Sequence, residues 1–231
     1  MSIGLPTAKN PSLPVRLAGI VTILLLIATP VWTAAGTPEN PKIAQAGAAK
    51  VIVALGDSLT AGYGLAASEA LPAQLENRLR AEGFNVRVRN AGVSGDTTAG
   101  GRARLDWVLA ERPHVVLLAL GANDGLRAVD PAQTRANLDA ILTELKRRGI
   151  KVVFAGMLAP PNLGTTYGAA FKAVFADLAR RHDVKFYPFL LRGVASVPRL
   201  NLADGIHPNA EGVGVMAAGL APLFRDLLRA E

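Results

Sequence analysis

An aspartate and a histidine three residues apart near the end of the chain have the residue types and spacing of a paired acid and base. Asp204 and His207 flank Gly205-Ile206, and Pro208 follows directly. One turn of backbone can bring the Asp204 carboxylate to one ring nitrogen of His207, which leaves the other ring nitrogen to accept a proton from a serine. The alternative is a solvated turn before a helix.

The serine that such a pair could activate lies near the other end of the chain. Ser58 belongs to Gly56-Asp57-Ser58-Leu59, directly after the apolar run 51–55. A serine at the end of a buried strand projects into the crevice beyond the sheet, where its small neighbours let a substrate carbonyl approach. The alternative is that Ser58 merely caps the following helix.

Two further strand ends offer uncharged hydrogen-bond donors for an oxyanion. The segment 90–98 contains glycines that allow close approach of the backbone, so the N–H of Gly95 could point into the crevice. The segment 121–125 contains Asn123, whose side-chain amide donates two N–H bonds without carrying charge. The alternative is turn chemistry, for which Gly and Asn are common residues.

Alternating strands and helices must position these residues. Short apolar runs predict strands, and apolar residues at helical spacing predict helices between them. This alternation predicts one three-layer α/β/α domain over residues 50–231, with a mainly parallel, flavodoxin-like five-stranded sheet and ligands at the carboxyl ends of its strands. The predicted strands are 51–55, 86–88, 115–120, 152–155 and 184–187, and the predicted helices are 71–81, 102–111, 131–148, 167–181 and 209–228.

Composition excludes several classes of function. The 231 residues include no cysteine, which excludes disulfides, thiolate metal sites and a Cys nucleophile. With three histidines and no cluster of ligands, we expect no metal and no organic cofactor. The net charge of +7 is compatible with peripheral contact to an anionic envelope surface, but dispersed charge and 5% aromatic residues argue against a nucleic-acid partner. We expect a monomer.

The first 35 residues have the layout of a secretory signal. Lys9 and Arg16 precede an apolar run over 17–31, and small residues allow cleavage after Ala35. Residues 36–49 contain two prolines without periodicity, which indicates a flexible linker. The alternative is an uncleaved anchor. Either way, we expect the remainder in the periplasm or secreted.

The arrangement resembles the SGNH (GDSL-type) hydrolase family over residues 51–228. Four blocks match in order, at 56–59, 90–98, 121–124 and 204–207. Through the Gly62-Tyr63 pair and the segments 121–126 and 160–167, it also resembles the secreted bacterial thioesterase/arylesterase/lysophospholipase subgroup. Thr60 and Ala122 are mild departures from the residues common in the family.

The resemblance implies roles for individual residues. By it, Ser58 is the nucleophile, His207 the base and Asp204 the orienting carboxylate, and the N–H groups of Ser58 and Gly95 form the oxyanion hole with the Asn123 side chain. It also implies a small acyl-ester, thioester or lipid-like substrate. Loop acids at 57, 96 and 124 are interpreted as braces. The expected substrate-binding residues are Leu126, Pro160, Tyr167 and Ile206.

Three other interpretations remain open. The α/β-hydrolase fold shares the chain order Ser, Asp, His but requires a glycine where Thr60 stands. A carbohydrate O-acetyl esterase on the same fold would cleave acetylated glycans and ignore longer acyl chains. A non-catalytic binding module on a flavodoxin-like sheet would not react with a serine-directed organophosphate.

Overall fold

The structure is a computed structural model, and it describes residues 48–229. The predicted signal segment, residues 1–35, lies outside the described residues, as do residues 36–47 of the predicted linker. Across 48–229, no helix combines the length and the apolar character needed to cross a membrane.

A five-stranded parallel sheet forms the middle layer. Its strands run in the order β2-β1-β3-β4-β5, and all four pairings are parallel. Residues 52–55 of β1 and all of β3 are buried, as expected of strands covered on both faces. The strands are β1 (Lys50–Gly56), β2 (Val86–Gly92), β3 (Val115–Ala119), β4 (Lys151–Ala155) and β5 (Lys185–Tyr187).

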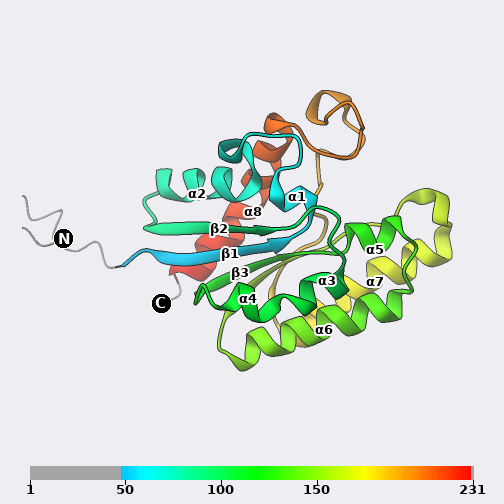
Figure 1. The fold of residues 1–231 in the computed structure, drawn as a ribbon, viewed down its shortest axis with the longest axis horizontal. Helices are drawn as coiled ribbons and strands as arrows, with labels where there is room; N and C mark the ends of the chain where they lie inside the picture. Colours follow the sequence, from blue (N-terminus) through cyan, green and yellow to red (C-terminus); the bar gives the residue numbers. More distant parts are fainter. Residues whose placement is uncertain (1–47, 230–231) are drawn as a thin grey trace, which may run out of the picture. The chain divides into compact units, whose positions relative to one another are not determined.

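Helices cover both faces of this sheet, which confirms the predicted three-layer fold (Figure 1). On one face, α2 (Leu71–Ala81) packs against α8 (Ala210–Arg229). The other face carries α3 (Thr98–Ala103), α4 (Leu105–Leu109), α6 (Pro131–Arg147) and α7 (Thr165–His182). The short helices are α1 (Ser58–Ala61) after β1 and α5 (Ala122–Leu126) after β3, with 3-10 turns at η1 (Ala67–Glu69), η2 (Pro161–Leu163) and η3 (Pro198–Leu200).

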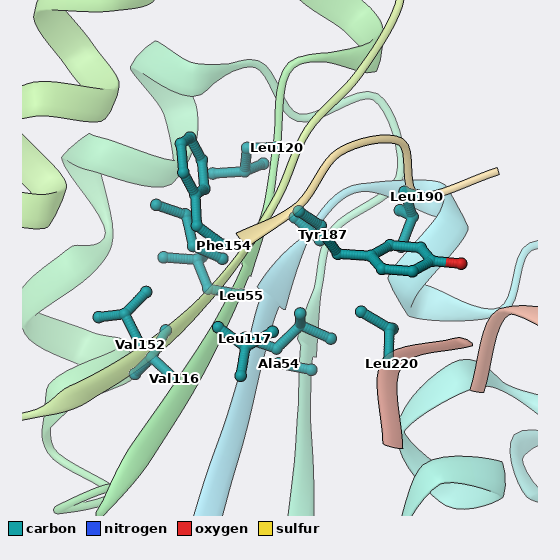
Figure 2. Close-up of a cluster of buried hydrophobic side chains, with 14 of the residues drawn as sticks. Ala54, Leu55, Val116, Leu117, Leu120, Val152, Phe154, Tyr187, Leu190 and Leu220 are labelled. Carbon is teal, nitrogen blue, oxygen red and sulfur yellow. The ribbon is translucent and has the colours of Figure 1, made fainter. Parts of the chain in front are cut away.

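Side chains of the central strands fill a core on each face of the sheet (Figure 2). On one face, the Phe154 ring lies 5.7 Å from that of Phe175 on α7, measured between centroids. On the other, Tyr187 stands against α8, where a Cβ added at Gly219 would lie 2.1 Å from the Tyr187 hydroxyl. A glycine at 219 therefore lets α8 approach the last strand closely.

The predicted helix 102–111 is wrong in its bounds. The structure has two shorter helices, α3 and α4, divided at Arg104, whose φ of −102° and ψ of 12° end α3. The Arg104 guanidinium turns inward, where its Nε donates to Asp96 Oδ2 over 2.7 Å and its Nη2 to the Gly56 carbonyl over 3.0 Å. Spacing of apolar residues did not predict this break because an arginine usually faces solvent.

Candidate active site

The candidate residues lie at the carboxyl edge of the sheet, beside the point where the strand order reverses. The chain passes from β1 to β2 on one side and then to β3 on the other side of β1. The segments that follow β1 and β3 therefore diverge and leave a crevice, which is where open α/β sheets bind ligands. Ser58 follows β1 and Asn123 follows β3.

The structure brings Ser58, His207 and Asp204 into one hydrogen-bonded chain. His207 Nε2 lies 2.9 Å from Ser58 Oγ, although 149 positions separate the two residues in the sequence. His207 Nδ1 lies 2.7 Å from Asp204 Oδ2. This geometry lets the imidazole take the serine proton while the carboxylate holds the ring.

Asp204 is held as a charged carboxylate. Its Oδ1 accepts the backbone N–H of His207 over 3.0 Å and that of Ile206 over 2.9 Å. The His207 backbone N–H, then the His207 ring and the Ile206 N–H, lower the pKa of Asp204 to about 2. Asp204 therefore stays ionised at neutral pH, with its negative charge against the His207 ring.

The position of the imidazole is set by backbone pairing and by an aromatic ring. The Leu202 N–H donates to the His207 carbonyl over 2.7 Å, and Asn201 forms an isolated bridge with Pro208. The Tyr63 ring lies 4.4 Å from the His207 ring, centroid to centroid. Sequence reasoning did not single out Tyr63 as a site residue, because its only signal was the Gly62-Tyr63 pair in the family resemblance.

The turn that carries Ser58 is braced by the residue before it. Asp57 is fully buried and accepts the Leu59 N–H at Oδ1 over 3.0 Å, which caps α1. Its other oxygen has no hydrogen-bond partner among the described residues. Burial raises the pKa of Asp57 to about 6, against the lowering effect of the Leu59 N–H.

Gly95 and Asn123 line the same cavity as Ser58 and His207. Asn123 Nδ2 donates to the Asp96 carbonyl over 2.9 Å, and this contact uses one of the two N–H groups of the amide. Gly95 has a φ of +83°, which favours glycine, in the loop at residues 93–97, here called the glycine loop. The structure thus brings Gly95 and Asn123, two of the three predicted oxyanion-hole residues, to the cavity that the third, Ser58, also lines.

The loop acids form structural contacts, in line with their interpretation as braces. Asp124 is buried and accepts from the Thr98 N–H over 2.8 Å, from Thr98 Oγ1 over 2.5 Å and from Thr134 Oγ1 over 3.3 Å. Asp96 pairs with the partly buried Arg104. Asp124 therefore ties α5, which carries Asn123, to the first turns of α3 and α6.

A cavity of about 830 Å³ opens beside Ser58 and His207. Of the predicted substrate-binding residues, Leu126, Pro160 and Ile206 line it. Tyr167 does not, because its hydroxyl donates to the Val129 carbonyl over 2.7 Å and its ring stacks on Phe171. Apolar side chains that the sequence did not assign complete the walls, namely Met157, Leu158, Ala159, Phe189, Leu191 and Ala195.

The arrangement can perform nucleophilic chemistry on an uncharged carbonyl. A hydroxyl has its base within hydrogen-bond distance, and the base has an ionised orienting group. Uncharged donors line the same cavity, and its walls are largely apolar. Within residues 48–229, no group of three His, Asp or Glu side chains is placed to hold a metal ion.

Comparison with protein-family models gives one match over most of the described chain. The model described as the GDSL-like lipase/acylhydrolase family matches residues 54–215. All the candidate site residues fall within this range.

Named relatives and solved structures are similar over nearly their full length. Esterase TesA of Pseudomonas aeruginosa is 40% identical over 187 residues, 80% of this chain and 93% of that protein. Thioesterase 1/protease 1/lysophospholipase L1 of Escherichia coli K12 is 38% identical over 185 residues, 80% of this chain and 88% of that protein. A crystal structure of TesA, 40% identical, aligns with a TM-score of 0.74 over 77% of this chain and 99% of that one. Psychrotrophic esterase EstA from Pseudoalteromonas, 29% identical and inhibited by monoethylphosphonate in its structure, aligns with a TM-score of 0.73 over 78% of this chain and 99% of that one.

Proposed function

Since the chain belongs to the GDSL-like lipase/acylhydrolase family and is a carboxylic ester hydrolase of the SGNH type, we propose that it acts through Ser58, His207 and Asp204 on acyl esters and thioesters. The observation that carries this proposal is the chain of contacts from Ser58 Oγ to His207 Nε2 and from His207 Nδ1 to Asp204. A solvated turn at Asp204 would not place the imidazole on a hydroxyl 149 residues away.

The proposed reaction is a two-step acyl transfer to water. His207 Nε2 takes the Ser58 proton as Oγ attacks the carbonyl carbon, and the oxyanion is stabilised by the Ser58 N–H, the Gly95 N–H and the Asn123 amide. The imidazolium then gives its proton to the leaving alcohol or thiol, which leaves an acyl-Ser58 ester. Water attacks this ester with His207 as base, and the carboxylic acid is released.

The largely apolar cavity supports an acyl group as the part of the substrate that is buried. Leu126, Pro160 and Ile206 line it with six further apolar side chains from the segments 157–159 and 189–195. Transfer of a hydrocarbon chain from water to such walls stabilises binding by about 0.8 kcal/mol for each buried CH₂. Relatives named esterase, thioesterase and arylesterase fit the same choice of substrate.

Replacement of the nucleophile tests the mechanism. We expect Ser58→Ala to lower p-nitrophenyl ester turnover by at least about 10³-fold, because the acyl-enzyme can no longer form. Ser94→Ala, at a second serine that lines the cavity, should stay within about threefold of the unmodified protein. A p-nitrophenyl phosphonate ester should add its phosphonyl group to the intact mass of the protein, with release of p-nitrophenol, and should not add to that of Ser58→Ala. Turnover retained by Ser58→Ala would exclude Ser58 as nucleophile.

Acyl-chain length separates the proposal from a carbohydrate O-acetyl esterase on the same fold. We expect kcat/KM to rise from acetyl to octanoyl p-nitrophenyl esters, because longer chains bury more apolar surface in the cavity. Activity confined to acetyl esters would favour the O-acetyl esterase instead.

We also propose that the protein is exported. The support is the sequence layout of residues 1–35, with Lys9 and Arg16 before the apolar run 17–31. Intact mass of the protein recovered from a cell-envelope fraction would show a new N-terminus after Ala35, whereas an unprocessed chain would favour an anchor.

A further inference from the structure

An arginine next to the lining of the cavity is hydrogen-bonded to one of its walls. Arg127 is exposed and follows Leu126 directly at the end of α5. Its Nη2 donates to the Gly95 carbonyl over 3.0 Å. Leu126 and Gly95 both line the cavity, so Arg127 follows one lining residue in the sequence and is hydrogen-bonded to the backbone of another.

The same helical turn joins this arginine to the proposed oxyanion donor. The Arg127 N–H donates to the Asn123 carbonyl over 3.0 Å, and residues four apart lie on one face of a helix. Asn123 holds the Asp96 carbonyl and Arg127 holds the Gly95 carbonyl, so the two side chains grip successive peptides of the glycine loop. The guanidinium group and the amide proposed to meet the reacting carbonyl are therefore bound to neighbouring carbonyls of one loop.

The charge of Arg127 is not neutralised by the surrounding protein. Within residues 48–229, no carboxylate forms an ion pair with it. The acids of the adjoining loops are engaged elsewhere, Asp96 with Arg104 over 2.7 Å and Asp130 with the Ala132 N–H over 2.8 Å. A guanidinium group has five N–H donors, and the Gly95 contact uses one.

We propose that Arg127 forms an anion subsite at the cavity mouth, which binds a phosphate on the leaving alcohol or thiol of the acyl ester. The inference rests on the proposed function, because it places the ester carbonyl between Ser58 and Asn123. The apolar walls suit the acyl part, so a charged group on the leaving side stays at the open mouth, where Leu126 is 52% exposed and Ile206 50% exposed. The planar guanidinium fork matches the oxygens of a phosphate.

Paired substrates separate this role from simple support of the glycine loop. The first pair is 1-octanoylglycerol and 1-octanoylglycerol 3-phosphate, and the second is S-octanoylpantetheine and its 4′-phosphate. Arg127→Gln removes the charge and keeps a donor for the Gly95 carbonyl. Arg87→Gln is the matched control, because it makes the same charge change on exposed β2 at the amino end of the sheet.

We expect Arg127→Gln to raise KM for the phosphate substrate of at least one pair by about tenfold, in keeping with the loss of one exposed charge-assisted contact. Any change in kcat, or in KM for the neutral partner, should be smaller and common to both members of a pair, because both share the contact between Arg127 and the Gly95 carbonyl. Arg127→Lys should recover part of the loss, because the positive charge returns without the fork. A response in the glycerol pair assigns the subsite to phosphorylated alcohols, and a response in the pantetheine pair assigns it to phosphorylated thiols.

Three outcomes would overturn the subsite. Equal losses on the neutral and phosphate substrates would show that Arg127 only holds the glycine loop. An equal loss in Arg87→Gln would show an effect of net charge alone, and no change in either pair would show that Arg127 does not meet the substrate. Ser58→Ala is measured alongside as a separate test of the proposed function. If Ser58→Ala retained its turnover, the proposed function would be overturned, whatever the Arg127 variants show.

Discussion

Asp204 and Asp57 both interact electrostatically with the His207 ring, but Asp204 is exposed and Asp57 is buried. This difference in environment shifts their pKa values in opposite directions. Asp204 is exposed and receives two backbone N–H groups besides the His207 ring, which holds its pKa at about 2. Asp57 is buried next to Ser58 with one oxygen unpartnered, and burial raises its pKa to about 6. Only Asp204 thus keeps a full negative charge throughout the range in which esterases are assayed, whereas Asp57 changes charge within it.

The buried carboxyl group predicts a specific pH dependence of stability. Below pH 3.8, Asp57 is protonated in both the folded and the unfolded chain. As the pH rises to about 6, the unfolded chain loses this proton first, so the folded state loses stability, on the order of 3 kcal/mol in total. Asp57→Asn stays neutral and keeps an acceptor for the Leu59 N–H, so we expect its stability relative to the unmodified protein to rise between pH 4 and pH 7. Urea unfolding followed by far-UV circular dichroism at each pH measures this.

A variant of an exposed acid separates this effect from a general change of charge. Asp106→Asn alters a side chain that is 91% exposed, and it should follow the pH dependence of the unmodified protein. Parallel stability curves for Asp57→Asn and the unmodified protein would contradict the assignment of this pH range to Asp57.

At the scale of the elements, the site depends on short helices that are held by side chains from their neighbours. The sequence predicted the strand ends that carry Ser58 and Asn123, because runs of apolar residues followed by glycine are visible without the structure. It did not predict the break at Arg104 or the orientation of Tyr167, because both depend on hydrogen bonds to the distant carbonyls of Gly56 and Val129. Local periodicity contains no information about such partners.

The buried acid of α5 gives the element-scale prediction. We expect Asp124→Ala to lower the free energy of unfolding by about 3 kcal/mol, because it leaves the buried Thr98 N–H and hydroxyl without their acceptor. Because α5 also carries Asn123, kcat should fall together with stability. Asp226→Ala, at an exposed partner of Lys185, should cost less than about 0.5 kcal/mol. Urea unfolding and ester turnover measure both, and an unchanged kcat in a folded Asp124→Ala would contradict the positioning of Asn123 through this contact.

At the scale of the whole molecule, the proposed catalytic residues are divided between the start of the sheet and the segment that follows it. Ser58 lies directly after the first strand, whereas Asp204 and His207 lie in the segment 188–209 between β5 and α8. The three-layer order follows from the apolar pattern, so the sequence predicted it. The apolar pattern did not predict that residues 189–196 form a wall of the cavity, because turns fix the positions of these residues. One such turn is closed by a hydrogen bond from the Arg192 N–H to the Phe189 carbonyl.

This division predicts that activity is lost before the fold. Apart from η3 and the bridge between Asn201 and Pro208, the segment 188–209 has only turns, so we expect it to open more easily than the strands because fewer contacts must break. We expect ester turnover to fall at lower urea concentration than the far-UV circular dichroism signal.

Asn201 Nδ2 donates to the Val194 and Val197 carbonyls, each over 2.8 Å, and so holds this segment together. Asn201→Ala should therefore lower the urea midpoint of turnover more than that of circular dichroism. Coincident midpoints in both proteins would show instead that the segment unfolds with the sheet, as one cooperative unit.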